Sequence, residues 1–136
     1  MVTYILDSSA ILRYLDGEAG SDRVAQIIKG HLAGTAKAAV SAIHWGEVAG
    51  VICKLRGRST VDPVLARLAA FAFEIVPITS ERAVRAALLK VSRKIPYADA
   101  FGVELAADSS DCTLVTADFD LKAAAQDVKI EFLPKK

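Results

Sequence analysis

The stretch YILDSSAIL at residues 4–12 decides the fold class. Tyr4, Ile5 and Leu6 form a short apolar run typical of a buried strand, and residues 8–15 continue as a helix. Asp7 stands between them, at the carboxyl end of the strand and at a favoured N-cap position for the helix. A strand that leads directly into a helix indicates an α/β protein if the pattern repeats along the chain.

The strand–helix pattern repeats along the rest of the chain. Further strands are expected at residues 38–40, 74–76, 113–116 and 129–132. The helices expected between them cover residues 22–32, 43–56, 62–73, 80–94, 96–108 and 120–126, the third of these beginning at Asp62-Pro63. Because the strands are apolar throughout instead of alternating, they predict a mainly parallel sheet covered on both faces. We therefore expect a three-layer α/β/α fold with a sheet of four to five strands.

Composition restricts the class of protein further. An apolar fraction of 53% over 136 residues excludes a disordered chain. No linker or repeat divides the sequence, so residues 1–136 are expected to form one domain. Charge interrupts every apolar run before the roughly 18 residues that a membrane span needs, and no signal segment is evident, which favours a soluble, cytoplasmic protein. The net charge of +1 does not by itself indicate a nucleic-acid-binding protein.

Several side chains are expected to serve packing alone. Cys53 and Cys112 lie among apolar residues without CxxC spacing and are expected to be buried free thiols. His44, near a helix start, is expected to pack instead of binding a metal. One apolar stripe of the helix at residues 43–56 is expected to face the core, comprising Val48, Val51, Ile52 and Leu55.

Four acidic residues stand out by position. Asp7 and Asp118 each follow a predicted strand, and the carboxyl ends of parallel strands meet at one edge of a sheet. Glu47 borders the apolar stripe of its helix, and Asp99 lies in the first turn after Pro96. Taken singly, each acid also fits a helix cap, a helix-dipole partner or an edge side chain.

The motifs around these acids occur together in one order. DSSAIL at residues 7–12, SAIHWGE at 41–47, PYADA at 96–100 and LVTADFD at 114–120 together resemble the PIN-domain ribonucleases, and the small single-domain chain resembles the VapC-type toxins among them. By this resemblance Asp7, Glu47, Asp99 and Asp118 match an acidic quartet. Further matches are Asp120, as an additional acid, and the supporting hydroxyls Ser8 and Thr116. Leu121 stands where many members carry an aromatic residue, and Phe119 lies two positions earlier.

The resemblance implies a metal-dependent endoribonuclease, the toxin of a toxin–antitoxin pair. Asp7, Asp99 and Asp118 are expected to bind Mg²⁺ or Mn²⁺, since hard divalent ions prefer oxygen ligands. Glu47 is expected to orient the attacking water or to hold a second ion through water. The implied partners are an RNA substrate, a small cognate antitoxin and a second copy of the chain.

Other functions fit the sequence less well or remain open. A catalytically silent or housekeeping PIN module, acting in RNA processing or as a scaffold, is the main alternative. A haloacid-dehalogenase-like phosphatase needs a second acid where Ser9 stands, and a receiver domain needs an acidic pair where Asp7 is alone. Basic side chains that offer an RNA surface, or merely a solvated helix face, are Arg13, Lys54, Arg56, Arg58, Arg82, Arg85, Lys90, Arg93 and Lys94.

Overall fold

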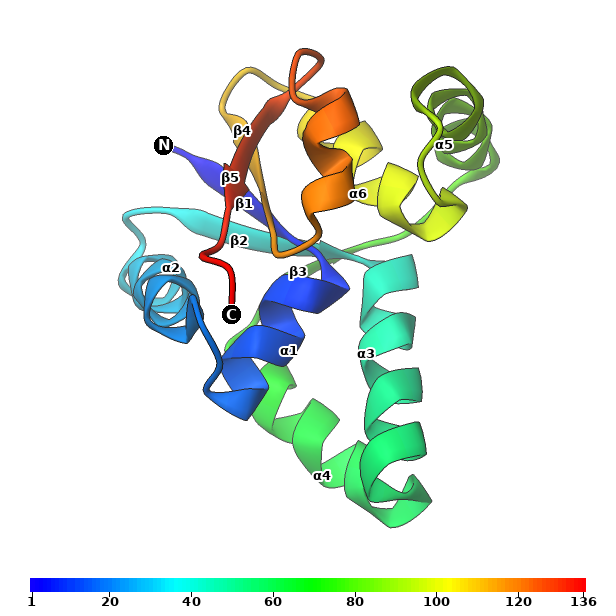
Figure 1. Cartoon of the computed structure of the whole chain (residues 1–136). Helices are drawn as coiled ribbons and strands as arrows, with labels where there is room; N and C mark the ends of the chain where they lie inside the picture. The colour runs from blue at the N-terminus through cyan, green and yellow to red at the C-terminus, as the bar shows by residue number, and fades with distance from the viewer.

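The computed structural model describes all 136 residues and has a five-stranded sheet at its centre (Figure 1). The strand order is β3-β2-β1-β4-β5, and every neighbouring pair is parallel. The predicted parallel α/β sheet is therefore confirmed, with the larger of the two expected strand numbers. The strands are β1 (Thr3–Leu6), β2 (Lys37–Ser41), β3 (Glu74–Val76), β4 (Cys112–Thr116) and β5 (Lys129–Phe132).

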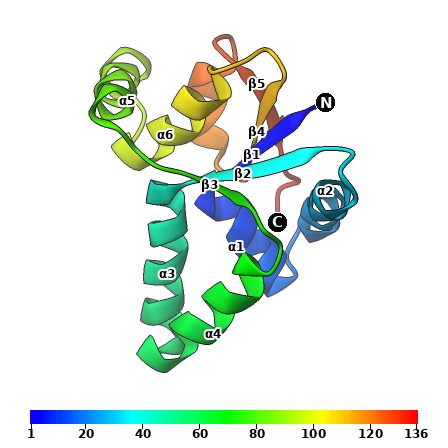
Figure 2. The same ribbon diagram turned by 180° about the vertical axis from the view of Figure 1, so that it is seen from behind.

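Helices cover both faces of this sheet, which gives the three expected layers (Figures 1 and 2). One face carries α1 (Ser8–Asp16), α2 (Ser21–Ala33), α3 (Ala42–Arg56) and α4 (Arg58–Ala69). The other carries α5 (Ser80–Arg93), α6 (Tyr97–Ala106) and the short 3₁₀ helix η1 (Phe119–Ala124).

Alternation along the strands divides the core into two halves. Leu6 and Val115 point to the α1–α4 side, whereas Ile5 and Leu114 point to the α6 and η1 side. All four side chains are at most 3% exposed. Since side chains alternate across a strand, an apolar strand buried on both faces supplies two cores at once.

The α3–α4 hairpin differs from the prediction at two places. Helix α4 begins at Arg58 instead of Asp62, and Pro63 lies inside it, so the helix loses one hydrogen bond but continues because it packs against α3. It ends at Ala69, before Phe73, and Ala72 adopts a φ of 58° in the turn that follows. All other predicted helices and strands agree within two residues.

Two expected burials are also wrong, and both lie towards the end of α3. Leu55 is 71% exposed and Cys53 is exposed, because the α3–α4 hairpin extends beyond the sheet (Figure 1). Val48, Ile52 and Cys112 are buried as predicted. No helix in the structure combines the length and the hydrophobicity needed to span a membrane.

A charged network that the sequence did not reveal fastens α5 to α6. Glu104 of α6 is only 3% exposed and accepts hydrogen bonds from Arg82 at 2.9 Å and from Arg85 at 3.0 Å. Arg82 also pairs with Asp108 at 2.6 Å. A buried carboxylate requires such partners, since an unpaired buried charge costs several kcal/mol.

Candidate active site

The centre of the sheet brings two of the predicted acids to one edge. Strands β1 and β4 are adjacent interior strands, and Leu6 lies beside Val115 in their register. Asp7 follows β1 directly, and Asp118 comes two residues after the end of β4. This is the point where the chain connections diverge to opposite sides of β1, the usual ligand-binding place in open α/β sheets.

Two helices bring the other two acids to the same edge. Glu47 lies in the second turn of α3, and Asp99 lies in the first turn of α6. The pKa of Asp99 is raised to about 7, first by burial and then by a hydrogen bond to Asp118 and by the charges of Asp118, Asp7 and Glu47. Asp118, Asp7 and Glu47 therefore lie close enough to Asp99 for their charges to act on it.

The two acids that follow strands β1 and β4 also cap helices. Asp7 Oδ1 accepts the backbone N–H of Ala10 at 3.0 Å and so caps α1. Asp118 Oδ1 accepts the backbone N–H of Asp120 at 3.0 Å and so caps η1. Each cap uses Oδ1 of its acid, and Asp118 in addition shares a hydrogen bond with Asp99.

The two predicted supporting hydroxyls each contact a quartet residue. Ser8 Oγ donates to Glu47 Oε1 at 3.0 Å and links α1 to α3. Thr116 Oγ1 accepts the backbone N–H of Asp118 at 3.0 Å and so shapes the turn that carries this acid. The Asp120 side chain is exposed.

Ser9 is a further supporting residue that the sequence analysis missed. Its hydroxyl donates to Asp7 Oδ1 at 2.6 Å and accepts the backbone N–H of Ala117 at 2.8 Å. It thereby joins the ends of β1 and β4, beside Thr116 Oγ1 at 3.3 Å. The available signal was its place two residues after a capping acid, where a hydroxyl can reach back to the cap.

The chemistry of these donors fits a hard divalent cation. All four acidic side chains offer oxygen only, which is the ligand type that Mg²⁺ and Mn²⁺ prefer. Carboxylates that raise the pKa of Asp99 by their mutual repulsion are also the groups that a cation would stabilise. In this structure no three acidic, histidine or cysteine side chains converge tightly enough to form a complete ion site.

Many of the basic side chains are committed to the fold. Arg82, Arg85 and Arg93 of α5 pair with acids on neighbouring elements. Arg56 pairs with Asp16, and buried Arg13 donates to the backbone carbonyls of Ala19 and Pro134 at 2.7 Å. The α5 arginines therefore do more than form a solvated face. Arg82 and Arg85 join α5 to α6, and Arg93 joins α5 to the turn that follows η1.

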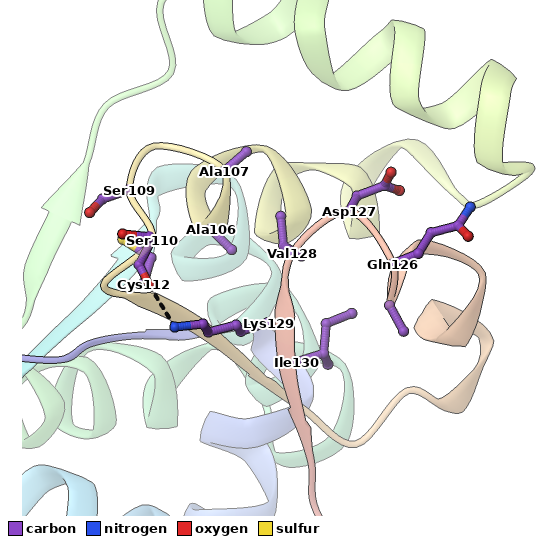
Figure 3. A pocket seen from close by; sticks show the side chains of 11 residues that line it. Ala106, Ala107, Ser109, Ser110, Cys112, Gln126, Asp127, Val128, Lys129 and Ile130 are labelled. Atoms are coloured by element: carbon purple, nitrogen blue, oxygen red, sulfur yellow. Dashed lines mark hydrogen bonds between the residues drawn. The ribbon is translucent and has the colours of Figure 1, made fainter.

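A sizeable cavity lies elsewhere in the molecule. A hollow of about 510 Å³ opens beside the beginnings of β4 and β5, the amino edge of these strands (Figure 3). Its lining is mixed, with small apolar side chains such as Ala106 and Val128, and Lys129 Nζ donates to the Ser110 carbonyl at 2.9 Å. None of the four acids lines it.

Comparison with known proteins agrees with this geometry. The family model described as the PIN domain matches residues 4–127, which is most of the chain. The chain belongs to the PIN domain family. The family that the four motifs predicted is therefore confirmed. A search among curated protein sequences returned no match.

Solved structures share the fold of this PIN domain. VapBC2 from Rickettsia felis, bound to a promoter DNA fragment, matches with a TM-score of 0.73 and 15% identity, over 96% of this chain and 98% of that chain. DNA-bound VapBC from Salmonella typhimurium matches with 0.71 and 15%, over 97% and 98%. A toxin–antitoxin complex from Klebsiella pneumoniae matches with 0.67 and 20%, over 94% and 95%.

Proposed function

We propose that this PIN domain is a metal-dependent endoribonuclease and the toxin of a VapBC-type toxin–antitoxin pair. The proposal rests on the positions of four acids from separate parts of the chain, namely Asp7, Glu47, Asp99 and Asp118. They lie at the carboxyl edge of the sheet, where the chain connections diverge to opposite sides of β1. Hydrolysis of a phosphodiester needs an activated water and neutralisation of charge on the phosphate oxygens. A bound Mg²⁺ or Mn²⁺ ion supplies both effects.

Each acid has a distinct role in this proposal. Asp7, Asp99 and Asp118 would hold the ion, and Asp7 and Asp118 at the same time cap α1 and η1. Glu47 accepts the proton of the attacking water or orients it, and Ser8 fixes the Glu47 carboxylate for this task. Ser9 and Thr116 hold the ends of β1 and β4 in register beneath the site.

The proposed partners follow from the fold and the surface. Solved structures with this fold are described as VapBC complexes, which supports a small antitoxin as partner. A second copy is supported by an apolar stripe on α5, where Val84, Leu88 and Val91 are 59%, 65% and 75% exposed. Such a stripe on the surface of a helix is typical of an interaction face.

The decisive experiment is an RNA cleavage assay on the purified protein. We expect cleavage with Mg²⁺ or Mn²⁺ and its loss in EDTA, with restoration when the ion is added back. Cleavage that persists in excess chelator would contradict the metal mechanism. RNA binding without cleavage, in the presence of either ion, would instead support a silent PIN module.

A further inference from the structure

His44 occupies a position that its expected packing role does not fully explain. It lies in the first turn of α3, three residues before Glu47, and only 1% of it is exposed. Its Nε2 lies 3.0 Å from the backbone oxygen of Ala98. Because a carbonyl oxygen only accepts, Nε2 carries the proton and donates it to Ala98. The buried Nδ1 has no hydrogen-bond partner.

The hydrogen bond of His44 joins the two helices that carry Glu47 and Asp99. Ala98 directly precedes Asp99 in the first turn of α6, and no side chain caps that helix at Pro96. The same nitrogen, Nε2, also lies 3.8 Å from Glu47 Oε1. One buried ring therefore sits between the backbone that sets Asp99 and the carboxylate of Glu47.

The surroundings of the ring leave it little freedom. A Cβ atom added at Gly102 of α6 would lie 3.4 Å from His44 Cε1 and 2.9 Å from Leu114 Cδ1. Gly102 thus makes room for Leu114 of β4, and α6 packs against the His44 ring at ordinary contact distance. At the other end, the backbone N–H of His44 is capped by Ser41 Oγ at 2.9 Å.

We infer that His44 is a positioning residue that fixes Asp99 and Glu47 relative to each other for cation binding. The inference rests on the proposed function, because it concerns the ion site formed by these acids. Side chains that orient metal ligands typically change metal affinity or activity by about 10–100-fold when they are replaced. His44 itself contacts neither the RNA nor the ion in this role.

The second histidine of the chain provides a matched control. His31 Nε2 also bonds a backbone oxygen, that of Ala72 at 2.9 Å, and its Nδ1 accepts the N–H of Ala38 at 3.0 Å. These bonds tie α2 to β2 and to the turn after α4, on the α1–α4 side of the sheet. Replacement of His31 therefore removes a comparable histidine–carbonyl bond without touching the acids.

The test is a calorimetric titration with Mn²⁺ alone, which measures its affinity for wild type and for the variants H44L, H44Q, H31L and H31Q. We expect H44L to weaken Mn²⁺ binding about tenfold or more, and H44Q to restore most of it, because the glutamine amide nitrogen reaches the position of Nε2. Both His31 variants should lower the melting temperature and leave Mn²⁺ affinity unchanged. In RNA cleavage, H44L should lower kcat with little change in KM.

Two outcomes would overturn the inference. One is a folded H44L that binds Mn²⁺ like wild type, and the other is an equal loss of affinity in H44L and H31L. If H44L does not fold, H44N takes its place, because its shorter amide does not reach the Ala98 carbonyl, and unchanged Mn²⁺ affinity in a folded H44N would also overturn the inference. A wild type that binds Mn²⁺ but leaves RNA intact contradicts the proposed nuclease alone, since the affinities still decide the role of His44.

Discussion

The two edges of the sheet differ in what they offer. The carboxyl edge carries four carboxylates, three supporting hydroxyls and a buried histidine, whereas a cavity of about 510 Å³ lies at the amino edge (Figure 3). The amino-edge cavity carries small apolar side chains and a lysine that is bound to a carbonyl. The proposed chemistry therefore rests on the ionisable groups at the carboxyl edge and not on the volume of the hollow at the amino edge.

The sharpest test of this difference is D99N. A neutral amide binds a hard divalent ion poorly, so we expect RNA cleavage to fall at least a hundredfold, a change of about 2.7 kcal/mol in the activation free energy. The measurement is a cleavage assay at saturating Mg²⁺. The metal-free variant should be at least as stable as wild type, because repulsion at Asp99 is relieved. A variant that melts lower in EDTA and cleaves at the wild-type rate would refute the assignment.

A smaller effect is expected from S8A, which removes the hydrogen bond to Glu47 Oε1. Hydrogen bonds to charged groups contribute about 1.5–3 kcal/mol, and because Glu47 is partly exposed we take the low end of this range, which corresponds to a loss of cleavage of about tenfold. S110A at the amino edge is the control, since the Lys129 bond uses the backbone oxygen of Ser110 and survives the change. Equal rates for S8A and S110A would contradict an active role of the Ser8–Glu47 pair.

The stability of the metal-free protein should depend on pH through Asp99. Its pKa is about 7 in the folded state against an ordinary value of 3.8, so the folded state binds the proton more tightly. The free energy of unfolding therefore falls as the pH rises from about 4 to about 7 and levels off above that range. Urea unfolding at several pH values should show this slope in wild type and a shallower one in D99N. Identical slopes would show that Asp99 is not the group responsible.

The smallest effect is expected from filling the amino-edge cavity. Ala107 lines this cavity and is exposed, so A107F adds bulk there without disturbing the core. We expect the RNA cleavage rate to stay within about twofold of wild type. A large loss in A107F, with an unchanged melting temperature, would break the comparison by tying the cavity to catalysis.

The difference between the two edges also explains what could be predicted from the sequence. The positions of Asp7 and Asp118 could be predicted, because each acid follows a strand and parallel strands end at the same edge of the sheet. Ser9, Glu104 and the bond from His44 to Ala98 were not, because each depends on how separate elements pack in space. The exposed Leu55 and the early start of α4 were missed for the same reason, since apolar spacing and a proline motif do not show where a hairpin leaves the sheet.

The buried Glu104 gives the molecule a cooperative unit that includes part of its acidic site. Helix α5 packs mainly on α6. If the two helices separated, the buried Glu104 carboxylate would lose its bonds to Arg82 and Arg85 and would have no partner. The two helices should therefore open together, with similar protection of their amide protons in hydrogen exchange. Because Asp99 lies on α6, the local opening of a surface helix and the integrity of the acid cluster are governed by one equilibrium.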